Sequence, residues 1–175
     1  MIDFQNIAKN RIELDEFQLM WRFTEPEYNE LPAEHLEQLT PLNKEASNFL
    51  WNLIADNGLH NHEPFGQEFF KTVDSTRIYE GNEQEVKKWL YQRGLPFSKQ
   101  VYLSWQPDIA VVTTWKLVVK YFNDFYYGGS DDLTIIDESL NWAVLFHHED
   151  EIYFGTNEKY ELSESEQLEL TKTSM

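Results

Sequence analysis

Hydrophobic side chains recur at helical spacing in the first hundred residues. The clearest run places its apolar positions three and four residues apart, on one face of a helix: Leu42, Ala46, Phe49, Leu50, Leu53 and Ile54. Thr40 followed by Pro41 has the residue types of an N-cap and a first helical position, and Gly58 supplies a stop signal. This pattern predicts a helix that begins at Thr40 and ends before Gly58.

Two shorter helices are predicted in the same part of the chain. Pro32 suits a first helical position and predicts a helix through Leu39. Asn82 with Glu85 three residues later resembles a capping box, and Gly94 ends the apolar stripe that follows.

After position 100 the pattern changes to runs of β-branched and aromatic residues, which predict strands. We expect two strands over 101–105 and 109–112, or one bent strand through both, and three more strands over 133–136, 142–148 and 152–155, the last two joined by a tight polar turn. Between these groups, Thr113 or Thr114 is expected to cap a helix whose apolar face is Trp115, Val118, Val119, Phe122 and Phe125.

These elements predict an α+β fold, with helices packed on an antiparallel sheet contributed mainly by the C-terminal half. No stretch rich in Pro, Gly or Ser divides the chain, and no repeat is detectable. We therefore expect a single domain over residues 1–160. Residues 161–175 are polar and acidic, which predicts an acidic tail or a short helix.

Composition limits the classes of function. The chain has no cysteine, which excludes disulfides, thiolate metal sites and cysteine nucleophiles. Charged residues interrupt the N-terminal segment, and no apolar run approaches the roughly 18 to 20 residues that span a bilayer, so we expect a cytoplasmic protein without a membrane partner. The formal charge of −17 opposes binding to nucleic acid and is complementary to a basic protein, although solubility alone also accounts for an acidic surface.

The acidity is concentrated in one window. No Lys or Arg lies between Lys120 and Lys159, whereas nine Asp and Glu residues do. Five of these acids fall in predicted turns, where side chains can be displayed without disturbing the core: Asp131, Asp132, Glu149, Asp150 and Glu151. We predict that they lie on exposed loops and contact a basic partner.

Histidines form two pairs that could ligate a metal. His60 and His62 precede Glu63 in a predicted loop, and His147 is followed by His148. Adjacent residues of a strand point to opposite faces, so at most one of the second pair is expected to line a given site. The alternative set of metal ligands is therefore His60, His62, Glu63 and His148, while solvated loop histidines remain the simpler interpretation.

Other chemistry has little support in the sequence. Phosphate-binding loops, dinucleotide fingerprints and G-x-S-x-G motifs are absent, so no catalytic residue and no cofactor is predicted. The aromatic residues are expected to pack in the core, and any exposed Trp or Tyr would suit a protein interface.

A resemblance to known proteins is carried by four segments, which are Thr113-Thr114-Trp115, Phe125-Tyr126-Tyr127, Ser130-Asp131-Asp132-Leu133 and the run 142–149. They resemble small acidic bacterial proteins of unknown function, some of them similar to immunity proteins of polymorphic toxin systems. The resemblance implies a non-catalytic protein that neutralises a toxin by covering its surface, and it assigns no catalytic residue.

We therefore predict a non-catalytic protein-binding module, such as a toxin-neutralising immunity protein. Two alternatives stay open. One is a metal-dependent enzyme that uses the His60, His62, Glu63 and His147/His148 clusters, and the other is a self-associating scaffold.

Overall fold

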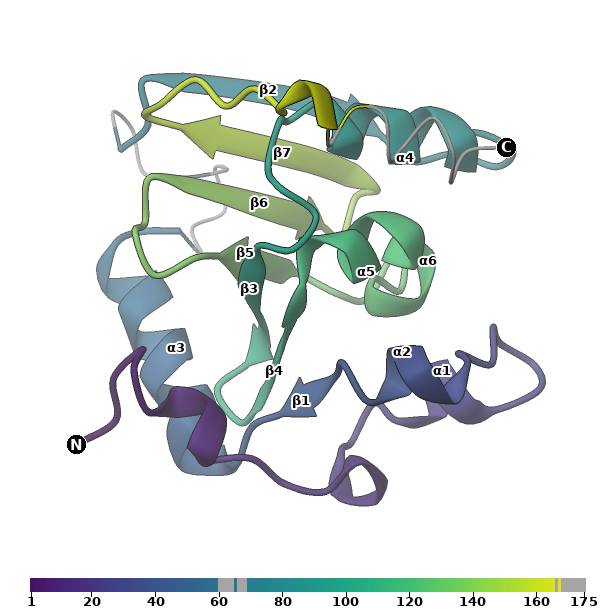
Figure 1. The fold of residues 1–175 in the computed structure, drawn as a ribbon, viewed down its shortest axis with the longest axis vertical. Helices are drawn as coiled ribbons and strands as arrows, with labels where there is room; N and C mark the ends of the chain where they lie inside the picture. The colour runs from purple at the N-terminus through teal and green to yellow at the C-terminus, as the bar shows by residue number, and fades with distance from the viewer. Residues whose placement is uncertain (60–64, 66–68, 166, 168–175) are drawn as a thin grey trace.

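The computed structural model describes residues 1–59, 65, 69–165 and 167. Its centre is a seven-stranded antiparallel sheet in the order β1-β4-β3-β5-β6-β7-β2 (Figure 1). The strands are β1 Thr40–Pro41, β2 Thr72–Arg77, β3 Gln100–Gln106, β4 Ile109–Thr114, β5 Leu133–Ile136, β6 Trp142–His147 and β7 Glu151–Thr156. The predicted α+β class and antiparallel sheet are confirmed.

Helices cover both faces of the sheet. The α-helices are α1 Trp21–Thr24, α2 Ala33–Leu36, α3 Lys44–Asp56, α4 Glu83–Tyr91, α5 Trp115–Lys120 and α6 Phe122–Phe125, and two short 3-10 helices are η1 Ile7–Lys9 and η2 Leu14–Glu16. In Figure 1, α3 lies on one side of the sheet, and α5 and α6 lie on the other. Among the described residues, none of the helices is long and apolar enough to cross a membrane.

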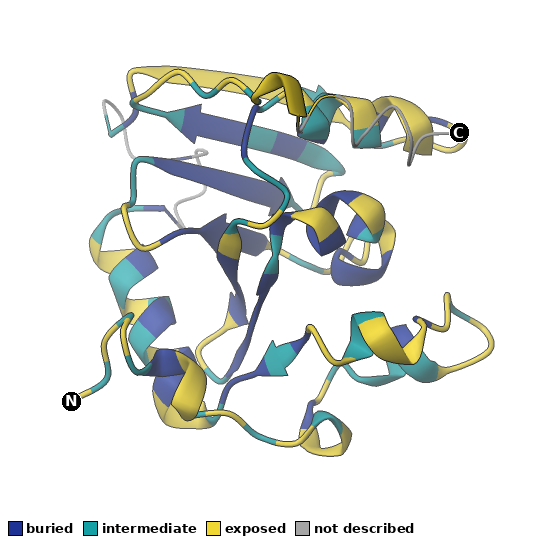
Figure 2. Ribbon diagram, viewed as in Figure 1, coloured by how far each residue is buried: buried dark blue, intermediate teal, exposed yellow. Residues whose placement is uncertain are grey.

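Two apolar clusters fill the spaces between sheet and helices. Side chains alternate across a strand, so Leu103, Val144 and Phe146 join the cluster with α4, α5 and α6, whereas Tyr102, Ala143 and Leu145 join the cluster with α3. The central strands are therefore buried on both sides, as the dark strands of Figure 2 show. Such burial explains why their sequences read as nearly continuous apolar runs.

The start of α3 differs from the prediction. Thr40 and Pro41 do not begin a helix; they form β1, which pairs with Val112 and Val111 of β4. Asn43 is the N-cap, and its side chain accepts a hydrogen bond from the backbone N–H of Ala46 at 2.9 Å. A Thr-Pro pair is also compatible with an edge strand, because Pro needs no ladder partner for its nitrogen.

Helix α4 is present where it was predicted, but the predicted capping box at its start is absent. The Asn82 side chain accepts from Tyr79 N and donates to Arg77 O, so it fixes the turn after β2 instead of capping α4. After α4, Gly94 has a φ of 77°, and the backbone carbonyl of Tyr160 lies so close that a Cβ would clash with it, so both the conformation and the space require glycine.

The predicted helix after β4 is divided into α5 and α6. Thr113 and Thr114 both belong to β4, and Thr114 also occupies the N-cap position of α5 without a side-chain capping bond. The predicted division at residue 160 remains a prediction, and much of 161–175 lies outside the described residues.

A buried polar cluster closes the turn between β5 and β6. Asp137 is 3% exposed and accepts hydrogen bonds from Trp142 Nε1 at 2.9 Å, Ser139 Oγ at 2.5 Å and Lys99 Nζ at 3.0 Å. Burial alone would raise the pKa of the Asp137 carboxyl, but the hydrogen bonds from Ser139, Lys99 and Trp142 and the charge of Lys99 outweigh burial and lower it.

Candidate functional site

The acidic turns come together at one end of the sheet. Leu133, the first residue of β5, pairs with Phe146 near the end of β6, so the segment before β5 lies beside the β6–β7 turn. Asp132 Oδ1 accepts hydrogen bonds from the backbone N–H of His148 at 2.9 Å and contacts its ring Nδ1 at 3.0 Å. We refer to residues 126–132 and 148–151 as the acidic loop pair.

The acidic loop pair is held by a tyrosine. Tyr126 is buried, and its hydroxyl donates to the backbone carbonyl of His147 at 2.6 Å and lies 3.0 Å from Asp150 Oδ1. Burial, followed by the hydrogen bond and charge of Asp150, raises the pKa of the Tyr126 phenol well above its usual value. The phenol therefore stays a neutral donor at all physiological pH values.

The five predicted contact residues differ in their environments. Asp132 and Glu149 are exposed, whereas Asp131, Asp150 and Glu151 are half-buried. Glu151 accepts from the hydroxyl of Tyr153 and lies 3.7 Å from Arg77 Nε, and the pKa of Tyr153 rises to about 12 through burial and this carboxylate. The role of all five in partner binding remains a prediction.

Asp131 is the clearest departure from the expected exposed acids. Its side chain is 13% exposed and forms an ion pair with Arg22, Nη1 to Oδ2 at 2.6 Å. Asp131 Oδ2 also accepts from the backbone N–H of Tyr127. The prediction that Asp131 lies exposed is therefore wrong, because a basic residue far away in the sequence folds against it.

The two C-terminal histidines also depart from the prediction. Their ring centroids are 4.1 Å apart, because β6 ends at His147 and His148 already belongs to the turn, where the alternation of a strand no longer applies. The expectation that at most one of these two histidines lines a given site is wrong. His60, His62 and Glu63 of the alternative metal set lie outside the described residues.

Aromatic side chains lie in and beside the acidic loop pair. Tyr127 is 47% exposed, and its ring lies 6.2 Å from that of Trp21, which in turn lies 4.9 Å from that of Tyr28. The guanidinium of Arg22 lies 5.2 Å from the centroid of the Trp21 ring and 5.5 Å from that of Tyr127. We refer to Trp21, Tyr28 and Tyr127 as the aromatic patch, which sequence periodicity could not reveal.

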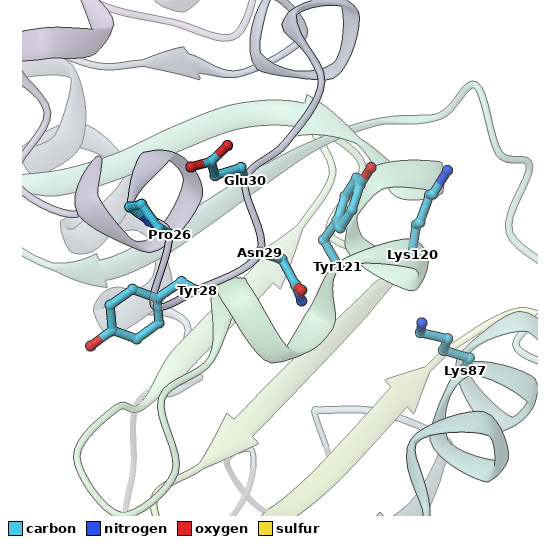
Figure 3. Close-up of a pocket in the computed structure, with 7 residues that line it drawn as sticks. All are labelled: Pro26, Tyr28, Asn29, Glu30, Lys87, Lys120 and Tyr121. Carbon is cyan, nitrogen blue, oxygen red and sulfur yellow. The ribbon is translucent and has the colours of Figure 1, made fainter.

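A hollow of about 540 Å³, which shares Tyr28 with the aromatic patch, lies between the segment 26–30 and the helices α4 and α5. Figure 3 shows Lys87 and Lys120 extending from these helices, with Asn29 and Tyr121 near them. Beside it, Asp124 is 8% exposed and accepts from Asn29 at 3.4 Å. Burial raises the pKa of the Asp124 carboxyl.

The hollow can offer ammonium and amide donors to a small anion. Glu30 in the lining and the nearby Asp124 oppose such a ligand, since like charges repel. His35 Nδ1 lies 2.5 Å from the hydroxyl of Tyr121, which anchors α2 to the end of α5.

Comparison with known proteins gives a family match over most of the chain. Residues 11–155 match a family described as "Protein of unknown function (DUF2947)". No curated protein and no solved structure matches the chain. Nothing in the family match connects the chain with immunity proteins. Because the match covers most of the sequence, the chain belongs to the DUF2947 family of proteins of unknown function.

Proposed function

We propose that this protein is a non-catalytic binding module that holds a basic protein partner against the acidic loop pair and the aromatic patch. The observation that carries the proposal is the meeting of Asp132 and His148, which brings two acidic turns from separate parts of the sequence to the same end of the sheet. The exposed carboxylates of Asp132 and Glu149 are available to a partner there.

The aromatic patch adds a different kind of contact. Interfaces draw much of their binding energy from a few Trp, Tyr and Arg side chains surrounded by polar residues. The Tyr127 backbone N–H donates to Asp131, and Trp21 lies against Arg22, so the Arg22–Asp131 ion pair fixes the loop that carries Tyr127. The patch would supply contact area, and the net charge of −17 would speed the encounter with a basic protein.

In its narrower form, the proposal is that the partner is a toxin and the protein is its immunity protein. Support comes from the charge and from the resemblance of the C-terminal segments. Co-expression with the product of the neighbouring open reading frame tests this form: rescue of growth supports it, and continued toxicity without a recoverable complex contradicts it.

The surface itself is tested by association kinetics with that purified partner. The Asp132→Lys/Glu149→Lys double variant should associate about tenfold more slowly at low ionic strength, and the difference should fade in about 1 M salt, where the Debye length is about 3 Å. A matched control is Glu45→Lys/Asp56→Lys, which changes the charge equally at exposed positions of α3, across the sheet. Equal slowing in both double variants would overturn the assignment of this surface.

Self-association is a second candidate, favoured by one observation. β2 is the last strand of the sheet, five of its six residues are exposed, and Val73 is 50% exposed. Asp74 and Arg77 oppose pairing of such an edge with another chain. A concentration series in analytical ultracentrifugation decides: a stable dimer that Val73→Lys dissociates supports the scaffold, and a monomer at all concentrations excludes it.

A further inference from the structure

Potential metal ligands are concentrated at the β6–β7 hairpin and at the neighbouring residue Asp132. Two groups of potential ligands share His147: one contains Asp132 and His148, and the other contains Glu149 and Glu151. Within each group, one donor atom from each residue lies within 4.8 Å of the others. Four side chains thus surround His147 at the end of β6.

The separations suit a common ion. Ligand atoms about 2.0 to 2.2 Å from a zinc ion lie about 3.0 to 3.5 Å from one another in tetrahedral or octahedral geometry. His148 Nδ1 lies 3.0 Å from Asp132 Oδ1 and 3.2 Å from Oδ2, which is already this separation. The side chains of His148 and Asp132 are 45% and 53% exposed, so both have room to rotate toward the donor atom of His147, which lies within 4.8 Å of theirs.

The backbone beneath these side chains is fixed. His147 pairs with Glu151 across the hairpin, and Asp150 adopts a left-handed conformation with a φ of 60° that closes the turn. The hydroxyl of Tyr126 donates a hydrogen bond to the backbone carbonyl of His147 and holds it in place. Rigid support of this kind holds ligands near their binding geometry, which lowers the cost of capturing an ion.

The chemistry of the donors indicates the class of ion. Two imidazoles with a carboxylate suit zinc, nickel or copper, whereas magnesium and calcium prefer oxygen ligands only. The net charge of −17 and the absence of Lys or Arg between Lys120 and Lys159 favour a dication. Arg77 Nε lies 3.7 Å from Glu151 Oε1 and competes with a metal ion for this carboxylate. We therefore expect Asp132 to supply the first carboxylate oxygen to the ion.

We propose that His147, His148 and Asp132 form a binding site for a divalent transition metal, with Glu149 or Glu151 completing the coordination. The site differs from the one expected from the sequence, because it needs neither His60 nor His62 and uses both adjacent histidines. It shares Asp132 and Glu149 with the surface proposed to bind the partner, and the inference concerns metal binding and assigns no reaction.

Titration of untagged protein with zinc chloride, after treatment with EDTA and dialysis, tests the site. Isothermal calorimetry should give one equivalent of bound zinc, and cobalt should give the visible absorption bands of a nitrogen- and oxygen-ligated ion. His148→Gln and Asp132→Asn, at exposed positions, and His147→Gln should each weaken zinc binding by at least the roughly tenfold that loss of an outer-shell partner costs. Magnesium should not compete.

The His60→Gln/His62→Gln double variant is the matched control, because it removes the other histidine pair and should keep the affinity of the parent protein. Circular dichroism of each variant reports whether the fold is intact, and the exposed His148→Gln and Asp132→Asn variants keep the test valid if His147→Gln unfolds. Absence of bound zinc in the parent protein overturns the site. Loss of zinc binding in the His60→Gln/His62→Gln variant, with binding kept in the His147, His148 and Asp132 variants, overturns it as well. Partner binding measured in EDTA is unaffected by either result, so failure of the metal site and failure of the proposed function are distinguishable.

Discussion

Arg22 and Asp131, 109 residues apart in the chain, form a two-point ion pair, with Nη1–Oδ2 and Nη2–Oδ1 distances of 2.6 and 3.2 Å. Their side chains are 7% and 13% exposed. The pair joins α1 to the loop that precedes β5, so the acidic loop pair and the aromatic patch depend on the same contact.

Asp131→Asn should therefore destabilise the protein. It leaves the buried guanidinium of Arg22 without a counter-charge, and removal of one partner of a buried pair costs about 3 kcal/mol in the free energy of unfolding. Urea denaturation measures this. The Arg22→Met/Asp131→Asn double variant should recover part of the loss, because it removes the unpaired charge. A single variant as stable as the parent would mean that the pair is solvated and weak.

The N-terminus of α3 offers a direct comparison between sequence pattern and structure. Asn43→Ala removes the hydrogen bond to Ala46 N and should cost about 1 kcal/mol. Thr40→Ala, at the position that the pattern indicated as the cap, should change stability by less than about 0.5 kcal/mol. Thermal and urea unfolding of both variants checks the order, and a larger loss for Thr40→Ala would contradict the assignment of the cap.

Much of the fold could be predicted because its signals are local. β3 to β7 are rich in β-branched and aromatic residues between turn signals, and α3 has a clear apolar stripe that ends at Gly58. β2 was not predicted, because five of its six residues are exposed at the end of the sheet and its sequence has no apolar alternation. β1 has only two residues, too few for any pattern.

The candidate site was less predictable, because its properties depend on contacts distant in sequence. Turn composition located the acids, but the partner of Asp131 is in α1, and no local pattern indicates Arg22. The close approach of the His147 and His148 rings depends on the residue at which β6 ends, and strand ends are the least certain part of a prediction from sequence.

Asp137→Asn should destabilise the protein at neutral pH by about 2 kcal/mol, because the hydrogen bonds that Asp137 accepts lose their charged acceptor. The folded-state pKa of Asp137 is below the ordinary value of 3.8, so the ionised carboxyl contributes stability that is present above 3.8 and is lost as pH falls through the lower folded pKa. The difference in unfolding free energy between parent and variant should therefore shrink as the pH falls below about 3.8. Urea unfolding from pH 2 to 7 measures it, and a difference independent of pH would contradict the lowered pKa.

Asp124 should show the opposite dependence on pH, because burial raises its folded-state pKa above the ordinary value of 3.8. The folded protein then binds the proton more tightly than the unfolded chain, so the protonated carboxyl contributes stability that is fully present below 3.8 and is lost as pH rises through the folded pKa. Asp124→Asn cannot titrate, and its amide can still accept the hydrogen bond from Asn29. The variant should accordingly gain stability relative to the parent as pH rises from about 3.8 to 7, whereas Asp137→Asn keeps a constant deficit over most of that range. Urea unfolding of the two variants in the same buffers compares the two buried carboxyls directly. A falling stability of Asp124→Asn relative to the parent over this interval would show that the Asn29 hydrogen bond and the charge of Lys87 outweigh burial at this position.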